Sequence, residues 1–172
     1  MELSTVKVIL GFARRWRVPA RHEDIPNACV KADKEKNLDI YLRIPQGMVI
    51  PAKELQKLGT TDKTRLALRL NNSLYGIKQA GRLWSQLLHK KLEEIGFTQC
   101  TADMCWYHKH QGTEMIIAGV YVDDLLVTVS LDDLVGDFFK GMETLSIKDL
   151  GKVRKFLGMR VELSDKDGYT LD

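Results

Sequence analysis

The sequence lacks any apolar run long enough to cross a membrane, since such a helix needs about 18 to 20 consecutive apolar residues. The longest apolar run, Met115 to Val122, contains a glycine and ends at two aspartates. The first seven residues, Met-Glu-Leu-Ser-Thr-Val-Lys, show no basic segment followed by an apolar block, so no secretory signal is visible. We therefore expect a soluble intracellular chain with no membrane partner.

Cysteine and proline are also scarce. The three cysteines, Cys29, Cys100 and Cys105, are odd in number and show no repeated pair spacing, which suits reduced thiols better than a disulfide framework. No matching His or Cys pair surrounds Cys100 and Cys105, which argues against a zinc site. Four prolines and 13 glycines, with 44% hydrophobic residues, exclude disordered and fibrous classes. The 172 residues allow one ordinary domain or a larger domain cut short.

Charge of one sign is not in excess, because the formal net charge is only +3, but the charges are segregated along the chain. Residues 1–22 contain five Lys or Arg against one acid, and residues 52–91 contain nine against two. Residues 92–124 contain one Lys against six acids. This pattern fits an ordinary solvated surface, and it also fits a phosphate-binding surface beside a metal site.

Hydrophobic periodicity predicts interleaved helices and strands. A helix is expected after Ser4 as N-cap, and another is expected from Ser130, where Asp133 gives a near match to a capping box. The clearest helix covers residues 78–95, although Gly81 lies inside it. Strands are predicted over 20–25, 40–44, 104–108, 115–122 and 125–129, followed by a hairpin over 153–163. Antiparallel hairpins among helices indicate an α+β domain with helices on one face of a sheet.

The sharpest local feature is Tyr-Val-Asp-Asp, residues 121–124, at the apex of an apolar hairpin. Adjacent ionised carboxylates repel each other unless water screens them or a cation lies between them. Aspartate is also a common turn residue, so the tetrapeptide is open to a purely structural interpretation. The two strands that flank Asp123 and Asp124 favour a site, because unpaired acids inside a sheet would be costly.

A magnesium pair needs a third carboxylate from elsewhere in the chain. Asp24 is the candidate, because it lies at the end of a predicted strand just before Pro26. Magnesium prefers hard oxygen ligands, and two ions about 3.5 to 4 Å apart would serve phosphoryl or nucleotidyl transfer. The alternative is that Asp24 caps a helix or a turn.

Five motifs then resemble the reverse transcriptases of copia-type LTR retrotransposons. Residues 74–84, Leu-Tyr-Gly-Ile-Lys-Gln-Ala-Gly-Arg-Leu-Trp, are similar to the family's Leu-Tyr-Gly-Leu-Lys-Gln-x-x-Arg-x-Trp, and residues 121–124 match its Tyr-Val-Asp-Asp. Asp24 to Ala28, followed by residues 41–47, lies where the family has Asp-Val-x-x-Ala-Phe-Leu and Tyr-Met-x-x-Pro-x-Gly. Lys-Asp-Leu-Gly at 148–151 and Phe-Leu-Gly at 156–158 complete the order.

The resemblance implies an RNA-directed DNA polymerase whose palm holds two magnesium ions, or manganese, on Asp24, Asp123 and Asp124. Asp123 would be the direct ligand together with Asp24, and Asp124 the more peripheral carboxylate. The implied fold is a ferredoxin-like or RRM-like antiparallel sheet, with partial fingers and the start of a thumb. Residues 1–172 would form a single partial domain, with the palm core at about 20–145 and a hairpin over 146–172 leading toward the thumb.

The resemblance also assigns substrate-facing residues. Tyr121 would stand near the primer end, and the position five residues after Asp24 would carry an aromatic ring that blocks the 2′-hydroxyl of a ribonucleotide. Here that sugar-gate position is Cys29, so we expect weaker rejection of ribonucleotides, and Pro26 is a second departure from the family pattern. The motif expected to support the template and the incoming nucleotide contributes Tyr75, Gly76, Lys78, Gln79 and Arg82.

The implied partners are RNA and DNA template-primer, deoxynucleoside triphosphates and the rest of a pol polyprotein, including integrase and RNase H. The implied location is cytoplasmic virus-like particles and the nucleus. Family members carry a longer segment before the first catalytic aspartate than the 23 residues found here, so we expect a truncated domain. One alternative is an inactive transposon remnant that binds nucleic acid through its basic segment 52–91. Another is an unrelated ferredoxin-like binding module.

Overall fold

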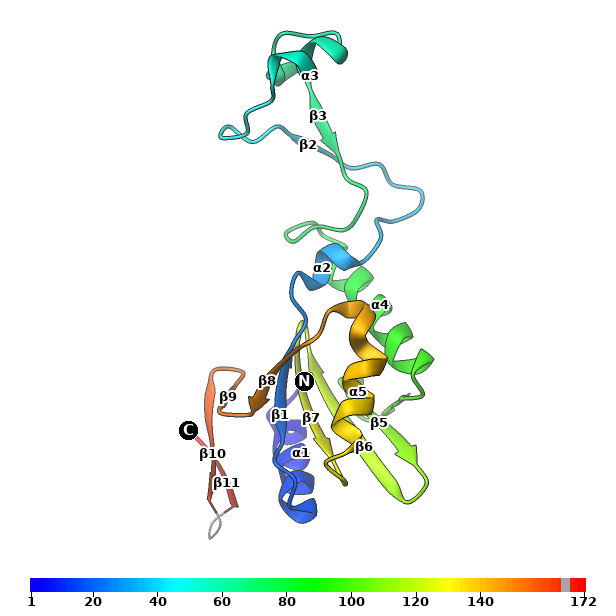
Figure 1. The fold of residues 1–172 in the computed structure, drawn as a ribbon, viewed down its shortest axis with the longest axis vertical. Coiled ribbons are helices and arrows are strands. Elements are labelled where there is room, and N and C mark those ends of the chain that lie inside the picture. The colour runs from blue at the N-terminus through cyan, green and yellow to red at the C-terminus, as the bar shows by residue number, and fades with distance from the viewer. Residues whose placement is uncertain (165–167) are drawn as a thin grey trace. The chain divides into compact units, whose positions relative to one another are not determined.

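The computed structural model describes residues 1–164 and 168–172. The chain forms two compact units, one made of residues 1–28 and 85–172 and the other of residues 29–84 (Figure 1). Each unit is described by itself below. None of the helices in the described ranges combines the length and the apolar composition that crossing a bilayer requires.

The first unit is built around a six-stranded sheet in which all neighbouring strands are antiparallel. The strand order is β4-β5-β6-β7-β1-β8, so the strand that comes first in the chain lies between two late ones. The strands span Thr98–Gln99 (β4), Trp106–Gln111 (β5), Glu114–Tyr121 (β6), Asp124–Val129 (β7), Arg21–Asp24 (β1) and Lys148–Lys152 (β8). Strands β6 and β7 form the predicted apolar hairpin. All four residues of β1 pair with β7.

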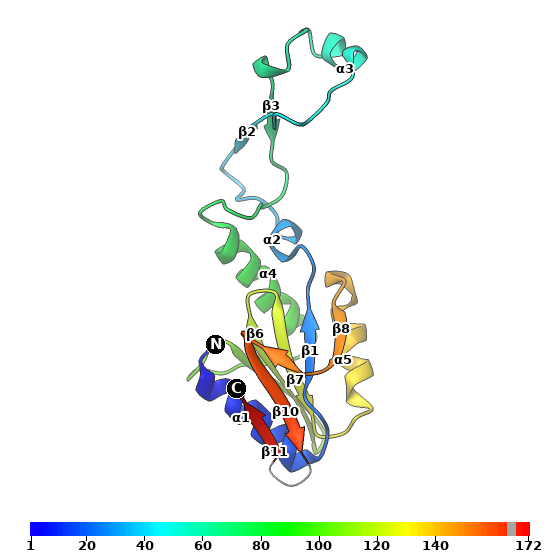
Figure 2. The ribbon, with the colours of Figure 1, turned by 90° about the vertical axis from the view of Figure 1, so that its left-hand side faces the viewer.

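Helices cover both faces of this sheet, whereas the sequence favoured helices on one face. Helix α1 (Leu3–Trp16) packs its apolar side against β6 and β7, burying Ile9 and Leu10 together with Ile117 and Leu126. Gly119 allows this close approach, because a Cβ at that position would lie 2.5 Å from Cδ1 of Ile9. Figure 2 shows α1 on one side of the sheet and α5 on the other.

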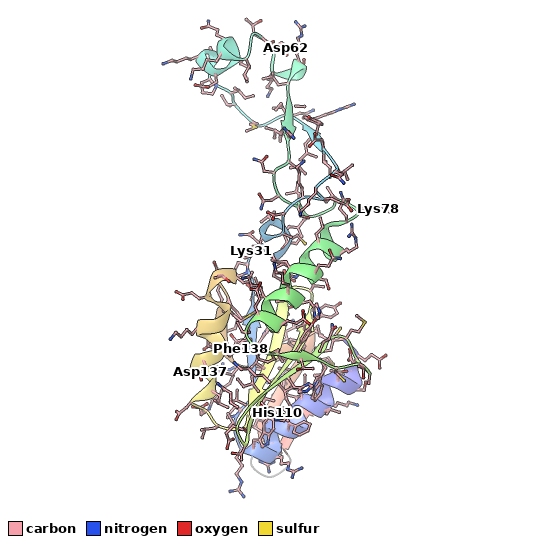
Figure 3. All side chains as sticks on the ribbon, turned by 90° about the vertical axis from the view of Figure 1, so that its right-hand side faces the viewer. Lys31, Asp62, Lys78, His110, Asp137 and Phe138 are labelled. Atoms are coloured by element: carbon pink, nitrogen blue, oxygen red, sulfur yellow. The ribbon has the colours of Figure 1, made fainter. Side chains whose placement is uncertain are left out.

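The opposite face is covered by α5 (Leu134–Met142), which continues into a 3-10 turn, Glu143–Leu145. Phe138 of α5 packs edge-on against Phe97, with ring centroids 5.8 Å apart (Figure 3). The chain after α4 (Ala80–Glu94) reaches the same helix, since Ile95 lies against Gly141. Helix α1 covers the other face because both faces of β6 and β7 are apolar.

A three-stranded sheet, in the order β11-β10-β9, lies beside α1 (Figure 2). It contains β9 (Lys155–Phe156), β10 (Met159–Ser164) and β11 (Gly168–Leu171). The predicted hairpin over 153–163 is confirmed by the pairing of Met159 with Phe156. Residues 165–167, within the expected 146–172 hairpin, lie outside the described residues. The backbone amide of Ala20 donates to the hydroxyl of Tyr169 at 2.8 Å, which ties β11 to the chain just before β1.

The second unit contains a two-stranded sheet of β2 (Tyr41–Arg43) and β3 (Ala67–Arg69). Between these strands the chain forms α3 (Ala52–Lys57) and a 3-10 turn, Lys63–Arg65. Helix α2 (Ala28–Lys31) begins at the boundary of the two units, and α4 runs from the second unit into the first. The strand predicted over 40–44 is confirmed by β2, while β3 was not predicted because residues 51–72 have weak periodicity.

The helix starts differ from those predicted. Helix α1 begins at Leu3 with Glu2 as N-cap, so Ser4 lies inside it. Helix α5 begins only at Leu134, because the hydroxyl of Ser130 instead donates to Glu114 and accepts from a β6 amide. Helix α4 begins at Ala80 rather than at residue 78.

Candidate active site

The three predicted catalytic aspartates come together at one end of the central strands. Asp24, the last residue of β1, is the register partner of Asp124, the first residue of β7. Asp123 immediately precedes Asp124, and its carbonyl oxygen accepts a 2.9 Å hydrogen bond from the amide of Ile25. Antiparallel pairing therefore brings the backbones of the Asp24 motif and the Tyr-Val-Asp-Asp motif together, although about a hundred residues separate them in the chain.

The turn of the β6–β7 hairpin is formed by Val122 and Asp123, one residue earlier than the predicted Asp123-Asp124 turn. The reason is pairing, because Asp124 is the register partner of Tyr121 in β6 and of Asp24 in β1. Val122 consequently has a φ of 57°, in the left-handed region that a β-branched residue rarely adopts. The hairpin thus places Asp124 in the sheet and Asp123 in a strained turn.

Directly opposed residues of an antiparallel pair have Cα atoms about 4.5 to 5.5 Å apart and side chains on the same face. Two ionised carboxylates in this relation, as at Asp24 and Asp124, destabilise the pair unless a positive group lies beside them. Here Nε2 of His22 lies 2.8 Å from Oδ1 of Asp124. The His22 ring in turn packs edge-on against Phe156, with centroids 5.3 Å apart. Sequence reasoning did not single out His22, because its contact with Asp124 runs diagonally between strands.

The donor chemistry of these residues fits a divalent cation, since three carboxylates supply hard oxygen ligands at adjacent strand ends. In their present orientations they do not surround a common point. Across the described ranges, no group of three or more His, Cys, Asp or Glu side chains is arranged to hold a metal ion. Asp124 would have to exchange its contact with His22 for one with the cation. The division of roles between Asp123 and Asp124 stays a prediction.

A hollow of about 420 Å³ opens beside Asp124. Tyr121, whose side chain is exposed, forms part of its wall, as do His22 and Phe156. The last residue of β8, Lys152, and the chain that follows it, with Arg154 and Lys155, contribute three cations to the same hollow. An acidic edge and a basic wall therefore share one concavity, an arrangement that suits a ligand carrying both phosphates and bound cations.

A fourth acid, Glu23, lies between His22 and Asp24 in β1 but faces the interior. Its side chain is completely buried, and neither carboxylate oxygen has a hydrogen-bond partner among the described residues. Burial raises the pKa of the Glu23 carboxyl from 4.5 to about 9; Asp149 adds to the rise and Arg21 opposes it. Arg21 itself is paired with Asp149 and lies 3.8 Å from Glu23. Glu23 is therefore a neutral acid in the folded chain at neutral pH.

The remaining predicted site residues belong to the second unit. Cys29, the predicted sugar gate, is buried in α2. Tyr75 is exposed and Gly76 has a φ of 87°. Lys78 and Gln79 lie in the turns before α4 rather than in its first turn, and Lys78 is exposed (Figure 3). Arg82 forms a 2.8 Å ion pair with Glu35. That these residues act together with the three aspartates stays a prediction.

The whole chain, residues 1–172, matches the family described as "Reverse transcriptase (RNA-dependent DNA polymerase)". With this match over its full length, the chain belongs to the reverse transcriptase family. No solved structure matches it.

Its relatives include Pol polyproteins of plant transposons. It is 27% identical over 166 residues to the retrovirus-related Pol polyprotein from transposon TNT 1-94 of Nicotiana tabacum, covering 94% of this chain and 11% of that protein. It is 28% identical over 162 residues to the Pol polyprotein from transposon RE1 of Arabidopsis thaliana, covering 92% and 10%. A putative transposon Ty5-1 protein of Saccharomyces cerevisiae is 36% identical over 103 residues, covering 59% and 33%. The chain is thus of the copia type and spans about a tenth of the plant polyproteins.

Proposed function

We propose that this chain carries the nucleotidyl-transfer site of a copia-type reverse transcriptase, with Asp24, Asp123 and Asp124 holding two magnesium ions. The observation that supports the proposal most strongly is the β1–β7 register, which sets Asp24 opposite Asp124. Opposed carboxylates at the end of a sheet are stabilised by a cation. When bound, such ions lower the pKa of an attacking hydroxyl and offset the charge of a triphosphate.

The neighbouring side chains have roles of their own in this proposal. Asp24 and the Asp123-Asp124 pair hold the cations from two strands. His22 holds the Asp124 carboxylate through its 2.8 Å contact until a cation replaces that contact. The cations Lys152 and Lys155 attract the phosphates of the primer or the nucleotide, and Tyr121 presents an aromatic ring on which a base can stack.

Primer extension on an RNA template in magnesium tests the proposal. The active-site variant is Asp123→Asn with Asp124→Asn. The chain offers a matched control, because Asp132 and Asp133 are also adjacent aspartates and both are exposed. The proposal predicts extension by the wild type and by the Asp132→Asn, Asp133→Asn control, and none by the active-site variant. If none of the three proteins extends the primer, the result contradicts the proposal and favours the alternative of an inactive nucleic-acid-binding remnant.

A further inference from the structure

A second concave surface of the first unit lies at the C-terminal end of α1 and carries only positive charge. Its volume is about 760 Å³. Three arginines from the end of α1 line it together with Lys152 from β8 and Tyr169 from β11, and no acid among the described residues does so. We call this surface, lined by Arg14, Arg15, Arg17, Pro19, Lys152 and Tyr169, the arginine cleft.

We propose that the arginine cleft binds the phosphate backbone of a nucleic acid at a place separate from the three aspartates. Arg15, Arg17 and Lys152 are exposed and form no ion pair within the part of the chain that the structure describes. Like charges gathered in a concave surface raise the local positive potential and favour a polyanion. Arginine also matches phosphate geometry with paired N–H donors.

The backbone conformation of Arg17 is a second, independent observation. Arg17 caps α1 with a φ of 60° and donates its amide to the carbonyl of Arg14 at 3.2 Å. Glycine or asparagine usually occupies such a left-handed cap, because other residues pay a steric cost there. Basic residues in the last turn also complement the helix dipole. The dipole does not explain why the cap residue is an arginine or why β8 places a lysine beside it. The cleft instead gathers cations from two elements.

The floor and the position of the cleft favour a nucleic acid over other polyanions. The Tyr169 hydroxyl is fixed by the amide of Ala20, so the ring is held in place among the cations and offers a surface for a sugar or a base. Lys152 lines both the arginine cleft and the hollow beside Asp124. The two concave surfaces therefore meet at Lys152, and a strand held in one can continue into the other.

Fluorescence anisotropy with a labelled single-stranded DNA and a labelled RNA–DNA duplex tests this surface, in EDTA so that no metal contributes. The test variant is Arg15→Gln with Lys152→Gln. The control is Lys90→Gln with Arg160→Gln, which removes two equally charged side chains that are both 73% exposed and each lie beside an acid. Each phosphate contact contributes about 0.7 to the salt slope for a single strand and about 0.9 for a duplex.

We expect the test variant to lower the slope of log K against log salt by about 1.4 on the single strand and about 1.8 on the duplex. At about 0.1 M salt this corresponds to roughly 20- to 60-fold weaker binding. The control should bind like the wild type, and Arg15→Lys with unchanged Lys152 should keep the slope. Circular dichroism and melting of every variant confirm that the fold is retained.

Equal losses in the test variant and in the control, or no loss in either, would overturn the proposal. So would displacement of the oligonucleotide by poly-glutamate of equal charge at equal concentration, because that result assigns the cleft to an acidic protein. The Asp123→Asn, Asp124→Asn variant should not bind more weakly than the wild type in EDTA. Failure of the catalytic proposal therefore leaves this test intact.

Discussion

The buried acid Glu23 makes the stability of the first unit depend on pH in an unusual direction. In the unfolded chain its carboxyl ionises with a pKa of 4.5, whereas burial in the folded chain raises that pKa to about 9. Between these values only the unfolded state releases the proton, so raising the pH favours unfolding. The contribution of Glu23 to stability is intact below pH 4.5 and is lost progressively as the pH rises toward 9.

The size of the effect follows from the same two values. Each pH unit above the unfolded-state pKa of 4.5 lowers the free energy of unfolding by about 1.4 kcal/mol. At pH 7 the buried Glu23 therefore lowers the free energy of unfolding by on the order of 3 kcal/mol relative to its value at low pH. Glu23→Gln keeps the shape but cannot ionise. We therefore expect the free energy of unfolding of this variant, relative to wild type, to rise by about 2 to 3 kcal/mol between pH 5 and pH 7. Glu23→Met, which also removes the unpartnered polar group, should add about 1 kcal/mol or more at every pH.

Urea unfolding followed by tryptophan fluorescence at pH 5, 6, 7 and 8 measures these differences. Trp16 and Trp106 report on the first unit, and Glu162→Gln, which removes an exposed carboxylate from β10, is the control. The control should show no comparable trend. A difference between Glu23→Gln and wild type that stays flat across this range would refute the reasoning. It would mean that Glu23 is ionised in the folded chain and paired with Arg21.

Three further predictions concern packing and the sugar gate. Gly119→Ala should lower the free energy of unfolding by about 1 to 3 kcal/mol in a melting experiment, because the new Cβ would lie 2.5 Å from Cδ1 of the buried Ile9. Gly136→Ala, in α5 with nothing within 4 Å of the added Cβ, should raise it by about 0.5 to 1 kcal/mol, and a loss there would contradict the open space at this position. Cys29→Phe should lower ribonucleotide relative to deoxyribonucleotide incorporation; equal discrimination by both proteins would exclude Cys29 as the gate. Because Cys29 is only 5% exposed, a melting curve must accompany that assay.

The three aspartates at the strand ends could be predicted from the sequence, because each lies in a short, recognisable sequence pattern. Two adjacent aspartates between apolar runs imply a hairpin. Asp24 follows from its place at the end of a predicted strand before Pro26, and the family motif agrees with it. The turn itself was misplaced by one residue, since its position depends on which residues pair across strands. Asp124 is held by both Tyr121 and Asp24, and this pairing forces Val122 into a left-handed conformation that no local propensity favours.

The features that sequence reasoning missed depend on tertiary packing. Strand β1 reads Arg-His-Glu-Asp, so its polarity hides the fact that Glu23 faces the core. Strand β8 reads Lys-Asp-Leu-Gly-Lys and gives no strand pattern, yet it pairs with β1 and supplies Lys152 to both concave surfaces. Helix α1 was predicted as a helix, but its place on the sheet was not. It lies on the face opposite α5 because both faces of the β6–β7 hairpin are apolar.

Manganese binding tests the central claim, that the aspartates brought together by β1 and β7 form a divalent-cation site. Free Mn²⁺ can be followed by its electron paramagnetic resonance signal as the ion is titrated into the chain. The proteins to compare are wild type, Asp24→Asn with Asp124→Asn, and the exposed control Asp132→Asn with Asp133→Asn. Binding by wild type and the control that is lost in the Asp24, Asp124 variant is the predicted result. Equal Mn²⁺ binding by all three proteins, or by none, would contradict it.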